Sequence, residues 1–115
     1  MTGEVQVSSV EGVTVVCFKD LRLVIHEDRF EQVEQEVWEI VDQEPSTPLI
    51  LDFENKELPT CHVVQQLFIR LHKRLGANFA LCNLPPFAML HFQVSHLAEL
   101  LNIHAAREDA LAAIK

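Results

Sequence analysis

The sequence predicts an α/β domain with a mixed, mostly parallel sheet of four or five strands, about four helices and an antiparallel hairpin at one edge. Short apolar runs of four to six residues alternate with longer amphipathic stretches, which is typical of β-α-β units. The first two runs are separated by only two residues, which favours a hairpin. The chain has 115 residues, three glycines and no Gly/Ser-rich linker, so we expect residues 1–115 to form a single domain.

The first two apolar runs predict paired strands. Residues 5–10 alternate imperfectly between apolar and polar side chains, and residues 13–18 are rich in β-branched side chains. Glu11-Gly12 between them supplies a tight turn. Residues 21–25 also alternate, which predicts a short extended segment before the first helix.

The first predicted helix follows Asp28, an N-cap candidate with Glu31 at the spacing of a capping box. Its apolar side chains share one helical face: Phe30, Val33, Val37, Ile40 and Val41. Trp38, on the flank of that face, is interpreted as the edge of the core, with a partner anchor as the alternative. The run Glu31, Glu34, Glu36 and Glu39 predicts a solvated face, or alternatively an acidic docking surface for a basic partner.

The second half repeats the strand–helix order. Residues 49–53 are almost wholly apolar, as in a central strand buried on both faces. We expect a second helix from near Thr60 to Gly76, a strand at 78–82, a strand stub at 102–104 and a last helix at 107–115. A third helix should begin at Pro85-Pro86, with apolar side chains at helical spacing: Phe87, Leu90, Val94, Leu97 and Leu101.

Charge and cysteine content limit the classes of function. The net charge of −8 disfavours binding to nucleic acid or to an anionic membrane. Residues 1–58 hold 14 acidic and 4 basic side chains, so a basic partner is compatible with this half. No apolar run is long enough to span a bilayer and the N-terminus lacks the pattern of a signal peptide, which predicts a cytoplasmic protein. Cys17, Cys61 and Cys82 are expected to be free thiols.

The order of elements and several short motifs resemble the STAS domain of anti-sigma-factor antagonists and anion-transporter tails. The resemblance covers essentially the whole chain. Its motifs are Val13-Thr14-Val15-Val16, Leu49 to Phe53, Leu71 to Gly76, Asn83-Leu84-Pro85, Ser95-His96-Leu97 and Glu108-Asp109-Ala110-Leu111. The resemblance implies a regulatory protein-binding module without enzyme activity or cofactor. The implied partner is an anti-sigma factor or a related switch kinase.

The family's most specific motif is Asp-Ser-Ser-Gly, whose first serine is phosphorylated by the partner kinase. Here the aligned stretch is Pro59-Thr60-Cys61-His62, which keeps a hydroxyl only at Thr60. The resemblance makes Thr60 the candidate phosphorylation site, and the altered motif leaves open a permanently unphosphorylated protein. From the residues alone, Thr60 is a helix N-cap. The expected partner-binding residues are Pro59, Thr60, Cys61, His62, Gln65, Gln66 and Arg70.

Two other classes of function stay open. The domain could be a structural subunit of a larger complex, such as a stressosome-like shell or a transporter assembly. It could also be a small enzyme or phosphocarrier that uses Cys61 or His62 near a helix N-terminus, where a thiolate is favoured. The six histidines share no spacing that suits a metal site. The predicted edge strand at residues 5–10 would allow a homodimer.

Overall fold

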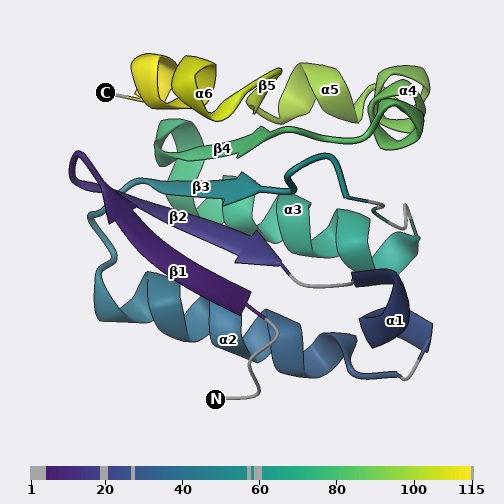
Figure 1. Ribbon diagram of the computed structural model, residues 1–115, viewed down its shortest axis with the longest axis horizontal. Helices are drawn as coiled ribbons and strands as arrows, with labels where there is room; N and C mark the ends of the chain where they lie inside the picture. The colour runs from purple at the N-terminus through teal and green to yellow at the C-terminus, as the bar shows by residue number, and fades with distance from the viewer. Residues whose placement is uncertain (1–4, 19–20, 27, 57, 59–60, 115) are drawn as a thin grey trace.

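The computed structural model describes residues 5–18, 21–26, 28–56, 58 and 61–114. Its elements, drawn in Figure 1, follow the predicted order except that residues 21–26 form a helix and two helices replace the third predicted helix. They are β1 Val5–Val10, β2 Val13–Phe18, α1 Leu21–His26, α2 Phe30–Gln43, β3 Leu49–Asp52, α3 His62–Leu75, the 3₁₀ turn η1 Gly76–Asn78, β4 Phe79–Cys82, α4 Pro86–Val94, α5 Leu97–Leu100, β5 Ile103–His104 and α6 Arg107–Ile114.

The five strands form one sheet in the order β1-β2-β3-β4-β5. β1 pairs antiparallel with β2, and the other neighbours are parallel. The mixed sheet and its N-terminal hairpin are therefore confirmed. The hairpin loop is Glu11-Gly12, and both residues have positive φ, 53° and 83°. This is the signature of a type I′ turn, whose twist matches that of the flanking strands.

The sheet has hydrophobic cores on both faces. On one face, the strands pack against α1, α2, α3 and α4 through a cluster that includes Val33, Leu51 and Phe68. On the other, α6 covers a smaller cluster that includes Ile50 and Leu111. All four residues of β3 are buried, so the prediction of a central strand covered on both faces is confirmed.

The N-terminus of α2 differs from the prediction. The helix begins at Phe30, and its N-cap is Arg29, which makes no side-chain cap hydrogen bond. Asp28 instead has a left-handed conformation (φ 57°) in the turn after α1, so the predicted capping box is wrong. Residues 21–25 were also expected to be extended but lie in α1, where Leu21 and Val24 are buried at a spacing of three residues. Their burial against the core overrides the local alternation.

The body of α2 follows its apolar pattern. Phe30, Val33, Val37 and Val41 are buried, and Trp38 packs at the edge of the core as predicted. The acidic run is not one solvated face, however. Glu36 is only 9% exposed, and Glu34 is partly buried against Arg70, while Glu31 and Glu39 are exposed.

The third predicted helix is divided into two helices, and the first of them buries a different side from the predicted one. α4 ends at Val94, and His96, in the left-handed region (φ 65°), separates it from α5. The buried side of α4 is formed by Ala88 and Phe92. The row Phe87, Leu90 and Val94, which the spacing assigned to the core, faces solvent. Both sides of this helix carry apolar residues, so the pattern could not identify the buried one.

Candidate docking site

The start of α3 carries the predicted partner-binding residues that the structure describes. The N-cap position is Cys61, one residue after the predicted Thr60, and its side chain makes no cap hydrogen bond. Cys61 and His62 are exposed, whereas Gln65 and Gln66 are partly buried. Pro59 and Thr60 lie outside the described residues.

Arg70 lies two turns further along α3 and turns toward α2. Its guanidinium is 3.6 Å from the carboxylate of Glu34, with more than half of the arginine side chain exposed. Burial raises the pKa of Glu34, and the charge of Arg70 opposes this shift. The pair lies at the surface between two helices, where an ion pair contributes little to stability and stays accessible to a partner.

The two helices of the candidate site meet at a polar contact. Gln65 Nε2 and His91 Nε2 are 2.9 Å apart, which joins the second turn of α3 to the middle of α4. Gln65 was among the predicted partner-binding residues, whereas no residue of α4 was. The contact therefore extends the predicted site onto a second helix.

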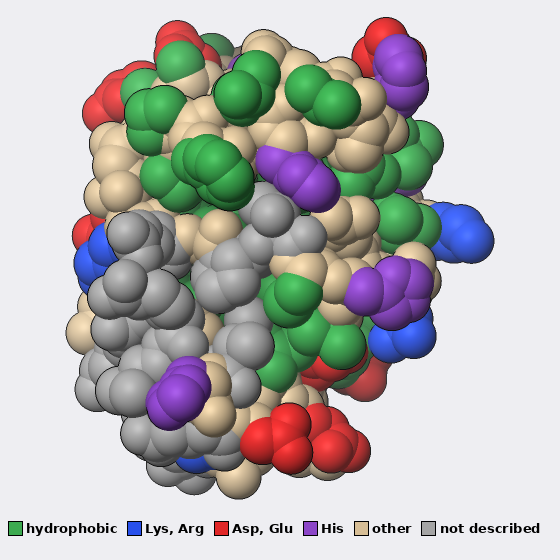
Figure 2. Space-filling model, turned by 90° about the vertical axis from the view of Figure 1, so that its right-hand side faces the viewer, with side chains coloured by type: hydrophobic (Ala, Val, Ile, Leu, Met, Phe, Trp, Pro, Cys, Tyr) green, Lys and Arg blue, Asp and Glu red, His purple; other side chains and the backbone are tan. Residues whose placement is uncertain are grey.

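The exposed side of α4 is apolar. Phe87, Leu90 and Val94 are 76%, 58% and 72% exposed, and their spacing of three and four residues places them on one side of the helix. Val63, in the first turn of α3, is 46% exposed. Figure 2 shows hydrophobic side chains gathered at this end of the molecule, with histidines among them. We call Cys61, His62, Val63, Gln66, Phe87, Leu90 and Val94 the docking face.

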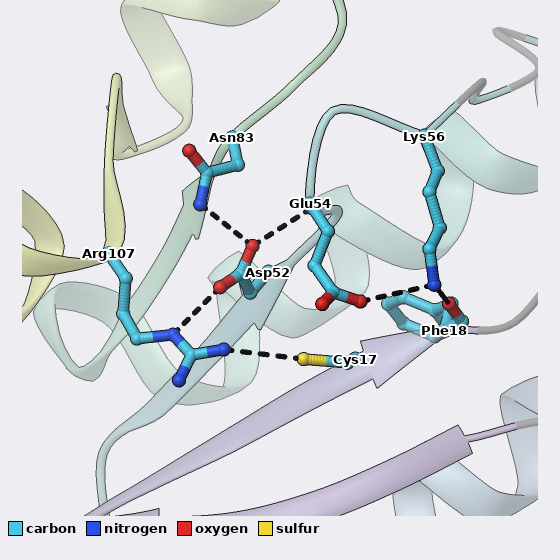
Figure 3. Close-up of polar contacts among 7 residues, drawn as sticks. All are labelled: Cys17, Phe18, Asp52, Glu54, Lys56, Asn83 and Arg107. Atoms are coloured by element: carbon cyan, nitrogen blue, oxygen red, sulfur yellow. Dashed lines mark hydrogen bonds and ion pairs between the residues drawn. The ribbon is translucent and has the colours of Figure 1, made fainter.

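A buried polar cluster lies at the carboxyl ends of the strands. Asp52, the last residue of β3, is 2% exposed. Its Oδ1 accepts hydrogen bonds from Asn83 Nδ2 and from the Glu54 N–H, both at 2.9 Å. Its Oδ2 accepts one from Arg107 Nε at 2.8 Å. Figure 3 shows these contacts converging on the carboxylate from three separate segments.

The cluster shapes the turn that leads from β3 toward α3. Glu54 and Asn55 both have positive φ (54° and 61°), which is uncommon for residues other than glycine. The Glu54 N–H donates a hydrogen bond to the Asp52 carboxylate. The Asn55 N–H donates to the Asn83 carbonyl at 2.8 Å. Arg107, the first residue of α6, fixes that helix to the same carboxylate. Asp52 is therefore a positioning residue for the segment before the docking face.

The electrostatics of the cluster follow from this geometry. Burial alone would raise the pKa of Asp52, but its three hydrogen bonds and the charge of Arg107 outweigh burial and hold the pKa below its ordinary value. Burial and the nearby Asp52 carboxylate raise the pKa of the Cys82 thiol to about 12. Burial also raises the pKa of Cys17, whose sulfur lies 3.5 Å from Arg107 Nη2. Both thiols thus stay protonated and unreactive at neutral pH.

The chemistry that this cluster can perform is limited. Cys17 and Cys82 pair in register with Asp52 from opposite sides, so the two cysteines are two strand spacings apart, about 10 Å. That separation is too large for a disulfide, and all three cysteines are free. Within the described residues, no group of three His, Cys, Asp or Glu side chains could hold a metal ion. The arrangement is suited to holding the fold together.

Neither this cluster nor the exposed apolar side of α4 was among the predicted site residues. Asp52 and Arg107 are 55 positions apart, and no local pattern joins them. One available signal was an acidic residue at the end of a wholly apolar strand, since a buried carboxylate requires partners.

The helices of the described residues include none long and apolar enough to cross a membrane.

No protein-family model matches the sequence, and no curated protein matches it. Solved structures do match. One is an anti-sigma-factor antagonist (STAS) domain protein from Planctomyces limnophilus, with a TM-score of 0.78 and 24% identity over 96% of this chain and 97% of the other. Another is a serine-to-glutamate variant of RsbS from Moorella thermoacetica, with a TM-score of 0.71 and 19% identity over 97% and 95% of the two chains.

Both likenesses extend over nearly the full length of both chains. The similarity therefore covers the complete fold of this chain, from the antiparallel β1–β2 pair through the parallel strands β2-β3-β4-β5, and is not limited to a fragment. The resemblance inferred from the sequence motifs is confirmed at this level. The chain has the fold of the STAS domain proteins.

Proposed function

We propose that this protein is a cytoplasmic, non-enzymatic regulatory module that binds a partner protein through the docking face. The observation that carries the proposal is the exposed row of Phe87, Leu90 and Val94 on α4, the helix whose His91 contacts Gln65 near the start of α3. Single exposed apolar residues are normal, but large apolar side chains grouped on one helix mark interaction sites. An exposed phenylalanine within such a group is a strong candidate for a binding hot spot.

The fold likeness supports the proposed class of partner. One matching structure is described as an anti-sigma-factor antagonist domain protein, and the same role here would require binding an anti-sigma factor or a related switch kinase. The mechanism would be competition, in which binding of this domain releases whatever the partner holds. The docking face suits that role because its apolar centre lies next to the polar residues at the start of α3.

Thr60 would be the switch within this mechanism. It directly precedes the N-cap Cys61 in the sequence. A phosphate there would add a charge of about −2 close to the docking face. Because an apolar interface disfavours an unpaired charge, phosphorylation should weaken binding. A Thr60→Glu variant should bind the partner more weakly than a Thr60→Ala variant, and equal affinities would remove the switch from the proposal.

A photo-crosslinking experiment in the native cells tests the docking face. A benzoylphenylalanine replaces Leu90 in one variant and the exposed Ala112 of α6 in a control variant. We expect position 90, and not position 112, to crosslink to one protein of the anti-sigma-factor or switch-kinase class. Mass spectrometry identifies that protein. Crosslinking to a stable assembly of another class would instead favour the structural-subunit alternative.

Binding to the identified partner then tests the residues. Phe87→Ala should weaken the affinity by about thirtyfold, since hot-spot truncations cost about 2 kcal/mol or more. The control Ala113→Ser, at an exposed position of α6, should leave the affinity unchanged. Equal affinities of the two variants would show that the partner binds elsewhere and would overturn the proposal.

A further inference from the structure

The opposite edge of the sheet carries a second surface, independent of the docking face. β1 is the terminal strand of the sheet, and among the described residues only β2 pairs with it. Figure 1 shows β1 along one side of the sheet, with α2 behind it and α4 at the far end of the molecule. An edge strand of this kind presents backbone groups that can pair with another chain.

The register shows which backbone groups face outward. In a two-residue hairpin the residues that flank the loop, Val10 and Val13, form a hydrogen-bonded pair, and the pairs alternate from there. Val5, Val7 and Ser9 are then non-hydrogen-bonded positions, so their N–H and C=O groups point away from β2. Thr14 on β2, which pairs with Ser9, confirms this alternation. Its N–H points away from β1 and donates to Pro48 O at 2.9 Å.

A groove of about 470 Å³ runs between this edge and α2. Its strand side is formed by Val5, Val7 and Thr14. Its helix side is formed by Glu36, Glu39, Ile40, Gln43 and Glu44. Glu36 is buried, Glu39 and Glu44 are exposed, and no described lining residue is basic. The side chains of a strand added to β1 would alternate between the groove and the opposite face of the sheet.

We propose that the β1 edge and this groove bind an extended basic segment of a partner protein by strand addition. Lysine or arginine at every second position would project over the acidic groove, while the intervening backbone pairs with Val7 and Ser9. A second copy of this chain fits less well. Antiparallel pairing through β1 would bring two acidic grooves together on one face, between chains that each carry a net charge of −8.

The test uses an eight-residue peptide in which lysine alternates with threonine or valine, with affinity measured by fluorescence polarisation. Glu39→Lys should weaken binding at least about tenfold more than Glu31→Lys. Both glutamates are exposed on α2, and both variants change the net charge equally, but Glu31 does not line the groove. Equal losses would reveal nonspecific charge attraction and overturn the proposal, as would the absence of saturable binding by the unmodified protein.

A second pair of measurements tests strand addition itself. Val7→Pro removes an outward N–H that β1–β2 pairing does not use, and an edge strand tolerates proline. We expect this variant, and a peptide N-methylated at alternate residues, to lose about tenfold or more in affinity. Full retention would overturn strand addition. Sedimentation of the protein alone completes the test, since a dimer that Val7→Pro dissociates would make a second copy the occupant.

Discussion

The ion pair between Asp52 and Arg107 predicts a large effect of a small substitution. Asp52→Asn preserves the size of the side chain but removes its charge. Each hydrogen bond to a charged group contributes about 1.5–3 kcal/mol net, and Asp52 accepts three hydrogen bonds. Asparagine keeps one oxygen acceptor but presents an amide donor where a second acceptor is needed. The Arg107 side chain is 33% exposed, so water replaces part of the lost contact. We expect a loss of about 2–3 kcal/mol.

The loss of stability in Asp52→Asn should become smaller at acidic pH. The pKa of Asp52 in the folded protein lies below its ordinary value of 3.8. A carboxyl with a lowered folded pKa stabilises the fold fully above its unfolded pKa, and the contribution disappears as the pH falls through the folded pKa. The stability difference between the unmodified protein and Asp52→Asn should therefore be constant from neutral pH to about pH 5 and shrink below about pH 4.

Urea unfolding followed by the fluorescence of Trp38, the single tryptophan, measures both effects. The matched control is Asp42→Asn, which removes the same charge from an aspartate–arginine contact of 3.0 Å at the surface. That exposed pair should contribute less than about 1 kcal/mol. If the free energy of unfolding falls no more in Asp52→Asn than in Asp42→Asn, the buried contacts of Asp52 do not stabilise the fold more than a surface ion pair does.

Three further predictions concern α4 and the thiols. Phe92→Ala, at a fully buried position, should lower the free energy of unfolding by about 3–5 kcal/mol. Phe87→Ala, on the exposed side of α4, should lower it by less than about 0.5 kcal/mol. Equal losses in urea unfolding would contradict the orientation of α4. His96→Gly should stabilise the protein by about 0.5–1 kcal/mol because glycine adopts a positive φ without strain, and a lower midpoint in thermal unfolding would contradict this. A thiol reagent at neutral pH should modify Cys61 rapidly, and the two buried cysteines only after unfolding; rapid modification of all three would contradict the burial.

Local sequence patterns predicted most of the secondary structure and the fold class. The apolar runs of β2, β3 and β4, the Glu11-Gly12 turn and the glycine that ends α3 are short-range signals. Each depends on backbone geometry or on burial within a few residues, so it can be read without knowing the rest of the fold. The same locality explains the errors at α1 and at the start of α2, where short patterns fit two structures equally well.

The predicted site was located only in part. The sequence motif led to the start of α3, where Cys61 and His62 are exposed. The apolar side of α4 could not be assigned, because both sides of that helix carry apolar residues and only packing against the sheet decides which is buried.

By itself the sequence determined an acidic α/β chain with a hairpin edge, a central buried strand and the approximate positions of the main helices. These depend on periodicity and turn chemistry, which are properties of neighbouring residues. Only the tertiary structure decided that Arg107 neutralises Asp52, that Phe87 faces solvent, and that three glutamates line the groove beside β1. These features bring together residues from separate elements, and burial, charge pairing and shape act between such residues whatever their distance in the sequence.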